Sequence, residues 1–437
     1  MHKEYERPPG VKISQADINE LHPTGLEYNA PARGMWNIVH QGMLIPEAHQ
    51  IFVCAQGCLR GVILTAAEML ELDRLSWVSV SEEDMFDGSL ETDIVDGVTD
   101  ILNRLGKRPP VVLLFLSCVH LFAGVDYENI LRELSGSFPD ITFIDCYMTP
   151  TMRTTVTPIV KMSAQMYRPL NVTKKDPKAI NIIGCDRPTD PDSELVRIIK
   201  GSGHTLRDIS ECNTYGEFQR MAEASLNIGY IPTCGLALEE LEEKHGTPSL
   251  YLPMSFDYDT ISENYSRLCG ELGIDTPDFS EDIAAAEKAL DDARSEVGDI
   301  AVAVDFTAVT RPLELMKLLS EHGFNVKYAV VDSVGEEAAA FEWLRDNRPD
   351  IELYSSTNVN MLYQHIRATE PVLAIGQKAA YYFATDHFVN IIMNGGLYGF
   401  SGITKLCGMI AEAYREPTDK RRLISHKGFG CASCLTN

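Results

Sequence analysis

The segment 38–61 reads I-V-H-Q-G-M-L-I-P-E-A-H-Q-I-F-V-C-A-Q-G-C-L-R-G, and the rest of the chain can be interpreted outward from it. An apolar run ending at Cys54 leads into a glycine-bearing turn that carries Cys58. Because glycine has no Cβ, the backbone around Gly57 can approach a bulky inorganic group closely. We therefore predict a metal-binding site where this strand ends.

A second segment, F-L-S-C-V-H-L-F-A-G at 115–124, repeats the arrangement. The preceding run V-V-L-L-F-L at 111–116 is apolar at every position, which is typical of a parallel strand buried on both faces. Cys118 then stands at the carboxyl end of that strand, where open α/β sheets bind their ligands. Cys54, Cys58 and Cys118 are the predicted metal ligands.

The pattern of strand, helix, glycine and strand restarts twice, at A-I-N-I-I-G (179–184) and at D-I-A-V-A-V-D (299–305). These restarts predict an α/β protein with three Rossmann-like, doubly wound parallel-sheet domains. We expect residues 1–177 to form an N-terminal arm and a cluster-binding domain. Residues 178–297 form the second domain, and residues 298–437 form the third domain with a cysteine-bearing tail.

Composition narrows the class of protein. A net charge of −25 over 437 residues argues against nucleic acid or an anionic membrane as a partner. The chain has no apolar run long enough to span a bilayer and no secretory signal at its start, so we expect a cytoplasmic protein. It also lacks the G-x-x-x-x-G-K-[ST] loop, so any ATP it depends on would be bound by a partner.

The eleven cysteines cannot all pair as disulfides, which favours free thiols and metal ligands. Closed zinc sites usually gather two local pairs, whereas Cys118 is distant in sequence from Cys54 and Cys58. This spacing favours an iron–sulfur cluster over structural zinc or three unrelated core thiols. A cubane needs a fourth ligand, which the partner subunit, the N-terminal arm or solvent could supply.

Three residues of the tail, His426, Cys431 and Cys434, could bind metal, form a redox pair or stay unliganded.

Four motifs together resemble the nitrogenase component 1 superfamily, which includes tetrapyrrole-reducing relatives. They are P-E-A-H-Q-I-F-V-C-A-Q-G-C at 46–58, L-S-C-V-H-L-F-A-G-V-D at 116–126, L-E-E-K-H-G-T-P at 241–248 and G-G-L-Y-G-F-S-G at 395–402. The resemblance covers the chain after about residue 30. It implies three Rossmann-like domains around a central cavity and a cluster at a subunit interface. It also implies a homodimer, or a heterodimer with a paralogue, that takes electrons from an ATP-hydrolysing iron protein.

The chain departs from this family pattern in three places. The zone N-A-P-A-R-G-M-W at 29–36 lacks a further cluster cysteine, which favours a single [4Fe-4S] cluster with Cys54 as a substitute ligand. Cys234 falls near the position where nitrogenase anchors its catalytic metallocluster, and it could be a cofactor ligand or a structural thiol. Tyr398 stands where nitrogenase has a histidine, which argues against dinitrogen reduction. The resemblance would place His387, Tyr398 and Lys378 around the cavity as proton donors.

We interpret the chain as a reductase subunit whose cluster passes electrons to a substrate in an interdomain cavity. That cavity could also hold a second metallocluster or a tetrapyrrole. The alternative is a non-catalytic scaffold on which a metallocluster is assembled and handed on. A third interpretation is a binding protein whose thiols are all structural.

Overall fold

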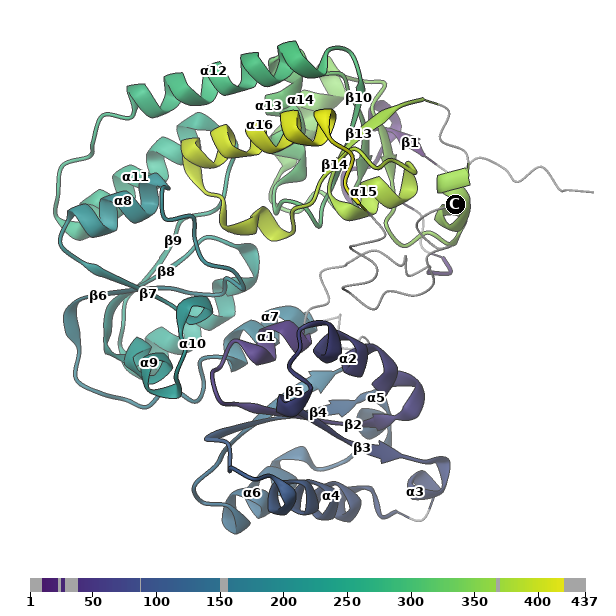
Figure 1. Ribbon diagram of the computed structural model, residues 1–437, viewed down its shortest axis with the longest axis vertical. Helices are drawn as coiled ribbons and strands as arrows, with labels where there is room; N and C mark the ends of the chain where they lie inside the picture. Colours follow the sequence, from purple (N-terminus) through teal and green to yellow (C-terminus); the bar gives the residue numbers. More distant parts are fainter. Residues whose placement is uncertain are drawn as a thin grey trace, which may run out of the picture.

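The computed structural model describes residues 10–22, 25–27, 38–86, 88–149, 156–366 and 370–419, without the side chains of residues 68 and 363–366. Figure 1 shows three α/β units, the first at the bottom, the second at the left and the third at the top. Each unit is built on its own sheet. The fold class predicted from the sequence is therefore confirmed.

The first unit contains a four-stranded parallel sheet in the order β3-β2-β4-β5. Every residue of β4 is buried, as its uninterrupted apolar sequence predicts. The strands are β2 (His49–Ala55), β3 (Leu75–Val80), β4 (Val111–Ser117) and β5 (Thr142–Met148). The helices are α1 (Ile38–Met43), α2 (Gln56–Glu68), α3 (Glu82–Phe86), α4 (Leu90–Arg104), α5 (Cys118–Ala123), α6 (Tyr127–Ser137) and α7 (Pro158–Gln165).

The second unit repeats this strand order in a four-stranded parallel sheet, β7-β6-β8-β9. Its strands are β6 (Asp176–Ile182), β7 (Thr205–Asp208), β8 (Ala224–Gly229) and β9 (Ser249–Tyr251). Its helices are α8 (Glu194–Gly201), α9 (Tyr215–Gln219), α10 (Gly235–His245) and α11 (Tyr258–Leu272). The Asp257 side chain caps α11 by accepting a hydrogen bond from the Thr260 backbone, 3.0 Å away.

The third unit has a six-stranded sheet in the order β1-β12-β11-β10-β13-β14. Its strands are β1 (Val11–Lys12), β10 (Ala301–Asp305), β11 (Val326–Val330), β12 (Glu352–Tyr354), β13 (Val372–Ile375) and β14 (Phe388–Val389). Its helices are α13 (Pro312–Glu321), α14 (Ala338–Asn347), α15 (Gln377–Tyr382) and α16 (Gly399–Arg415). The long helix α12 (Ser280–Val297) packs along α16 and leads into β10.

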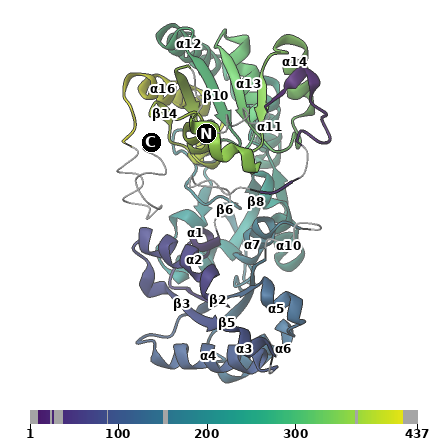
Figure 2. The ribbon, with the colours of Figure 1, turned by 90° about the vertical axis from the view of Figure 1, so that its right-hand side faces the viewer.

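The N-terminal segment lies on the third unit, although the sequence placed it with the first. β1 pairs antiparallel with β12, through Val11 opposite Leu353 and Lys12 opposite Glu352. The Ile13 backbone nitrogen then donates to the Ile351 carbonyl at 2.8 Å. Figure 2 shows this segment, in purple, beside α14. Pairing across so much sequence has no local signal, which is why the pattern of the arm alone could not predict it.

The predicted boundary after residue 177 falls just inside β6, and the one after residue 297 coincides with the end of α12. The division into three independent domains stays a prediction, because the largest cluster of buried apolar residues runs through all three units. Within the described residues, no helix combines the length and apolar character needed to cross a bilayer.

Candidate metal centre

The three predicted thiol ligands lie at one edge of the first sheet. Strands β2 and β4 are neighbours, with Val53 opposite Leu116, so Cys54 and Cys118 reach the same carboxyl edge. Cys54 is the next-to-last residue of β2, and Cys118 is the first residue of α5. Helix α2 begins at Gln56, and this places Cys58 in its first turn. The fold thus gathers one thiol from a strand and two from helix starts.

The electrostatics of Cys54 reflect this proximity. The side chain is almost fully buried, and burial raises the pKa of its thiol to about 12. The neighbouring Cys58 and Cys118 thiols raise the same pKa further, because negative charge on either one disfavours a second thiolate nearby. A bound metal reverses this preference, since a coordinating thiol gives up its proton to the metal.

The space beside these thiols is open. Cys58 is exposed, and Cys118 is half-buried with its Sγ donating weakly to the Met148 carbonyl, 3.9 Å away. A Cβ built on Gly57 or Gly61 would meet no atom within 4 Å. The prediction that glycine leaves room for a bulky group beside the thiols is consistent with this geometry.

The donor set fits a cluster better than a single ion. In the described part of the chain, no three His, Cys, Asp or Glu side chains are spaced to hold one metal ion. A cluster of several irons holds its thiolates on different metal atoms, so it needs wider spacing than a zinc ion does. Three free thiols at one sheet edge, one of them solvent-exposed, suit such a cluster with its fourth ligand from outside this edge.

Cys234, predicted as a cofactor-binding residue separate from the three cluster thiols, lies in a tightly packed place. It ends a short 3₁₀ turn before α10 and is fully buried, and burial raises its pKa to about 12. A Cβ on Gly229 would lie 2.3 Å from its Sγ, and a Cβ on Gly184 would lie 2.6 Å from its Cβ. The backbone at Gly184 and at Gly229 therefore packs directly against Cys234.

Tyr398 is also fully packed. Its hydroxyl donates to the Leu252 carbonyl at 3.1 Å, and its ring lies 5.1 Å from Tyr230 and 6.0 Å from Tyr265, between centroids. Burial raises the pKa of the Tyr398 phenol well above its usual value. Its proton is therefore held by a backbone carbonyl in this structure.

The other two predicted proton donors lie in the third unit. Lys378 is buried at the start of α15, and burial lowers the pKa of its ammonium, while the charges of Asp305 and Asp332 partly offset that effect. Nδ1 of His387 lies 2.9 Å from the Ala413 carbonyl on α16. The structure thus gathers the three thiols and distributes the remaining candidates over the second and third units. His426, Cys431 and Cys434, as well as the zone 29–36, lie outside the described residues.

A buried carboxyl that the sequence did not single out lies at the carboxyl edge of the second sheet. Asp208 ends β7, and its Oδ1 accepts hydrogen bonds from the Ser210 backbone nitrogen at 2.9 Å and hydroxyl at 2.7 Å. Its Oδ2 is buried and has no hydrogen-bond partner among the described residues. Burial raises the pKa of Asp208 to about 7, and the charges of Glu211 and Asp186 act in the same direction.

This carboxyl predicts a pH-dependent stability. The folded state keeps a proton on Asp208 that the unfolded state has lost above pH 4, so the free energy of unfolding falls as pH rises from about 4 to 7. Three pKa units correspond to at most about 4 kcal/mol. Asp208→Asn keeps an acceptor for Ser210 and removes the titration. Urea unfolding at pH 5.5 and pH 8 should show a smaller loss of stability in the variant; equal losses in both proteins would contradict the assignment.

Comparisons with known proteins agree with the fold. The family model described as "Nitrogenase component 1 type Oxidoreductase" matches residues 41–414. A solved structure described as "Nitrogenase Cp1 at pH 6.5" superposes with a TM-score of 0.67 at 16% identity, covering 93% of this chain and 98% of the other. Another, "Nitrogenase Cp1 at pH 5", gives a TM-score of 0.57 at 13% identity, covering 92% and 94%. No curated protein sequence matches the chain significantly.

Proposed function

Because the chain belongs to the nitrogenase component 1 type oxidoreductase family, we propose that it is a nitrogenase-like reductase subunit with an iron–sulfur cluster on Cys54, Cys58 and Cys118. The observation that carries this proposal is the gathering of these thiols at one sheet edge beside open space. When bound, a cluster of the [4Fe-4S] type supplies one-electron transfer at low potential. The chain's own part is to hold the cluster and to leave one side of it accessible.

Two protein partners belong to the proposal. An ATP-hydrolysing iron protein donates the electrons, since the chain carries no phosphate-binding loop of its own. A second subunit, identical or paralogous, covers the exposed thiol Cys58 and supplies or shields the fourth ligand position. The location of the complex would be the cytoplasm.

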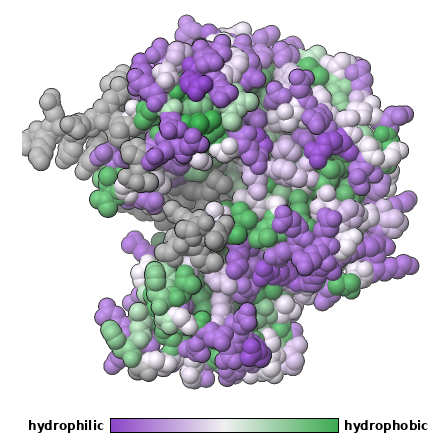
Figure 3. All heavy atoms as spheres, turned by 180° about the vertical axis from the view of Figure 1, so that it is seen from behind, coloured by the Kyte–Doolittle hydropathy of each residue, from purple (hydrophilic) through white to green (hydrophobic). Residues whose placement is uncertain are grey.

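The surface around the thiols supports a protein partner. Leu121 and Phe122 follow Cys118 in α5 and are 52% and 76% exposed. Leu64 on α2 and Trp77 on β3 are exposed in the same unit, and apolar side chains gather on its lower lobe in Figure 3. Exposed apolar side chains that gather on one lobe in this way mark interaction sites in soluble proteins.

Phe122→Ser should therefore weaken association with the partner subunit at least tenfold, because an exposed aromatic side chain at a protein interface is often worth more than about 1.4 kcal/mol. Sedimentation over a concentration series measures the effect. Phe86→Ser is the matched control, since Phe86 is 88% exposed on α3 rather than on α5, which carries Cys118. Equal association of both variants with the partner would argue against this surface.

The substrate would occupy a cavity between the units, and the cavity could also hold a second metallocluster or a tetrapyrrole. Lys378, His387 and Tyr398 remain proposed proton donors, with Tyr398 the most constrained because its hydroxyl already bonds to Leu252. For Cys234 we favour the structural role, since Gly184 and Gly229 close onto it.

The proposal is tested on anaerobically purified protein by iron and sulfide analysis with EPR spectroscopy. Turnover with an iron protein, ATP and a reductant then separates the enzyme from the alternative, a scaffold for metallocluster assembly. An enzyme forms a reduced product and keeps its cluster, whereas a scaffold releases its cluster to an acceptor. A colourless protein without iron would contradict both.

A further inference from the structure

A small pocket of about 210 Å³ lies between the second and third units, apart from the thiol edge. Thr233 comes from the turn after β8, while Arg311, Gly335, Glu336 and Glu337 come from the loops before α13 and α14. At roughly 30 Å³ for each water-sized group, the pocket holds a molecule of about seven heavy atoms. It is therefore suited to a small organic molecule.

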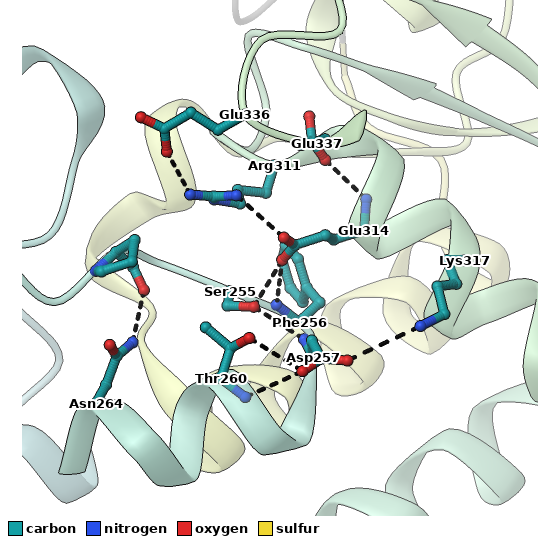
Figure 4. A network of polar contacts seen from close by, with 11 residues as sticks. Ser255, Phe256, Asp257, Thr260, Asn264, Arg311, Glu314, Lys317, Glu336 and Glu337 are labelled. Atoms are coloured by element: carbon teal, nitrogen blue, oxygen red, sulfur yellow. Dashed lines mark hydrogen bonds and ion pairs between the residues drawn. The ribbon is translucent and has the colours of Figure 1, made fainter. Parts of the chain in front are cut away.

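The charges of this pocket are unbalanced. Arg311 donates from Nη1 to Glu314 at 3.1 Å and from Nη2 to Glu336 at 2.6 Å, so its guanidinium is held between two carboxylates. Glu337 adds a third carboxyl against this single cation. Figure 4 shows the arginine between its two glutamates, with Glu337 close to the start of α13. An anionic ligand would find no unpaired positive charge here.

Glu337 is a buried carboxyl in the wall of this pocket. It is 6% exposed, and its Oε2 accepts a hydrogen bond from the Glu314 backbone nitrogen at 2.7 Å. Its other oxygen turns away from this network in Figure 4, and a hydrogen bond from the Leu313 backbone also lowers the pKa of the carboxyl. Burial raises the pKa of this carboxyl to about 8, because loss of solvent disfavours its ionised form. Glu314 raises that pKa further, and Arg311 lowers it.

The remaining walls suit the apolar part of a ligand. Phe306, Pro312, Val334 and Met393 line the pocket, and aromatic side chains attract organic cations. The Thr233 hydroxyl in the same wall is buried without a hydrogen-bond partner in the described part of the chain. A Cβ on Gly335 would meet no atom within 4 Å, so the space is unobstructed on that side.

We propose that this pocket binds a small organic cation with N–H donors, of the ammonium or amidinium class, and that the Glu337 carboxylate is its counter-ion. On binding, the carboxyl loses its proton to solvent and the cation donates a hydrogen bond to the freed oxygen. The site would serve a substrate or an effector, and it does not depend on the proposed iron–sulfur chemistry.

Three isosteric probes test the charge preference: acetamidinium, acetamide and acetate, with affinity measured by ligand-observed NMR on the full chain. We expect only acetamidinium to bind specifically. Since Glu337 must be ionised, its binding should be roughly 20-fold tighter at pH 8.5 than at pH 6.5. Comparable affinity for acetamide, tighter binding of acetate, or no binding of any probe would overturn the proposal.

Two variants locate the site. Glu337→Gln keeps an oxygen that can accept the Glu314 N–H bond and should lose at least tenfold in acetamidinium affinity, together with the pH dependence. Glu321→Gln removes the same charge from the far end of α13 and should leave both unchanged. Unchanged binding in the folded Glu337→Gln variant would overturn the assignment. If that variant fails to fold, the pH dependence and probe selectivity of the wild-type chain decide.

Discussion

Replacing Cys118 with alanine is expected to leave a folded, colourless protein without its cluster. A chain with three cluster thiolates would be left with two, and the iron content should fall from about four atoms per chain to below one. Cys118 is only half-buried, so the loss of its side chain should cost little folding stability. Iron and sulfide assays with EPR on anaerobically purified protein measure the result.

Cys212→Ala is the matched control, because Cys212 is also half-buried, at the carboxyl edge of the second sheet. Its iron content should equal that of the unmodified chain. Cys58→Ala should lose iron to the same extent as Cys118→Ala. The iron content of Cys54→Ala shows whether this buried thiol on β2 is a cluster ligand or only lies near the cluster. Full iron content in Cys118→Ala would show that the cluster lies elsewhere and would remove the basis of the proposed electron entry.

The second large effect concerns the backbone between the second and third units. Gly396 has a φ of +87°, and a Cβ added there would lie 2.1 Å from the Pro188 carbonyl oxygen. Because the obstacle is backbone, it cannot rotate away. Moving the two backbone segments apart to relieve this clash would also break the hydrogen bond from the Asp190 nitrogen to the Gly396 carbonyl, which is 2.9 Å long. Gly396→Ala should therefore lower the free energy of unfolding by about 3 kcal/mol or more.

Gly408→Ala provides the control within the adjoining helix α16. A Cβ on Gly408 meets nothing within 4 Å, and alanine favours a helix interior by about 0.5–1 kcal/mol over glycine. The two variants should thus shift urea-unfolding midpoints in opposite directions. If Gly396→Ala were as stable as the original chain, the close contact at Pro188 would be contradicted.

The sequence could predict the thiol edge because its signals are local. The fully apolar run of β4 identifies a buried parallel strand, and such a strand places the residue after it, Cys118, at a ligand-binding edge. The start of α2 was harder to predict, because Gly57 and Gly61 weaken the helical pattern. The helix nevertheless begins at Gln56, so Cys58 lies on a helix.

The other site residues depend on contacts between distant segments. Glu337 and Asp208 resemble ordinary surface acids in the sequence, and only the packing of loops around them removes their solvent. Tyr398 was predicted to face a cavity from its motif alone, yet its hydroxyl is bonded to Leu252, about 150 residues away in the chain. Sequence patterns identify the strand ends but not which side chains are desolvated by later elements.

The pairing of β1 with β12 has a consequence for how the chain is made. Val11 leaves the ribosome long before Leu353, its neighbour in the sheet, which follows 342 residues later. At 5–20 residues per second, this interval lasts roughly 17–68 s. During that time the segment around Val11 has no sheet edge to join, so it is open to chaperones and proteases until β12 has been synthesised.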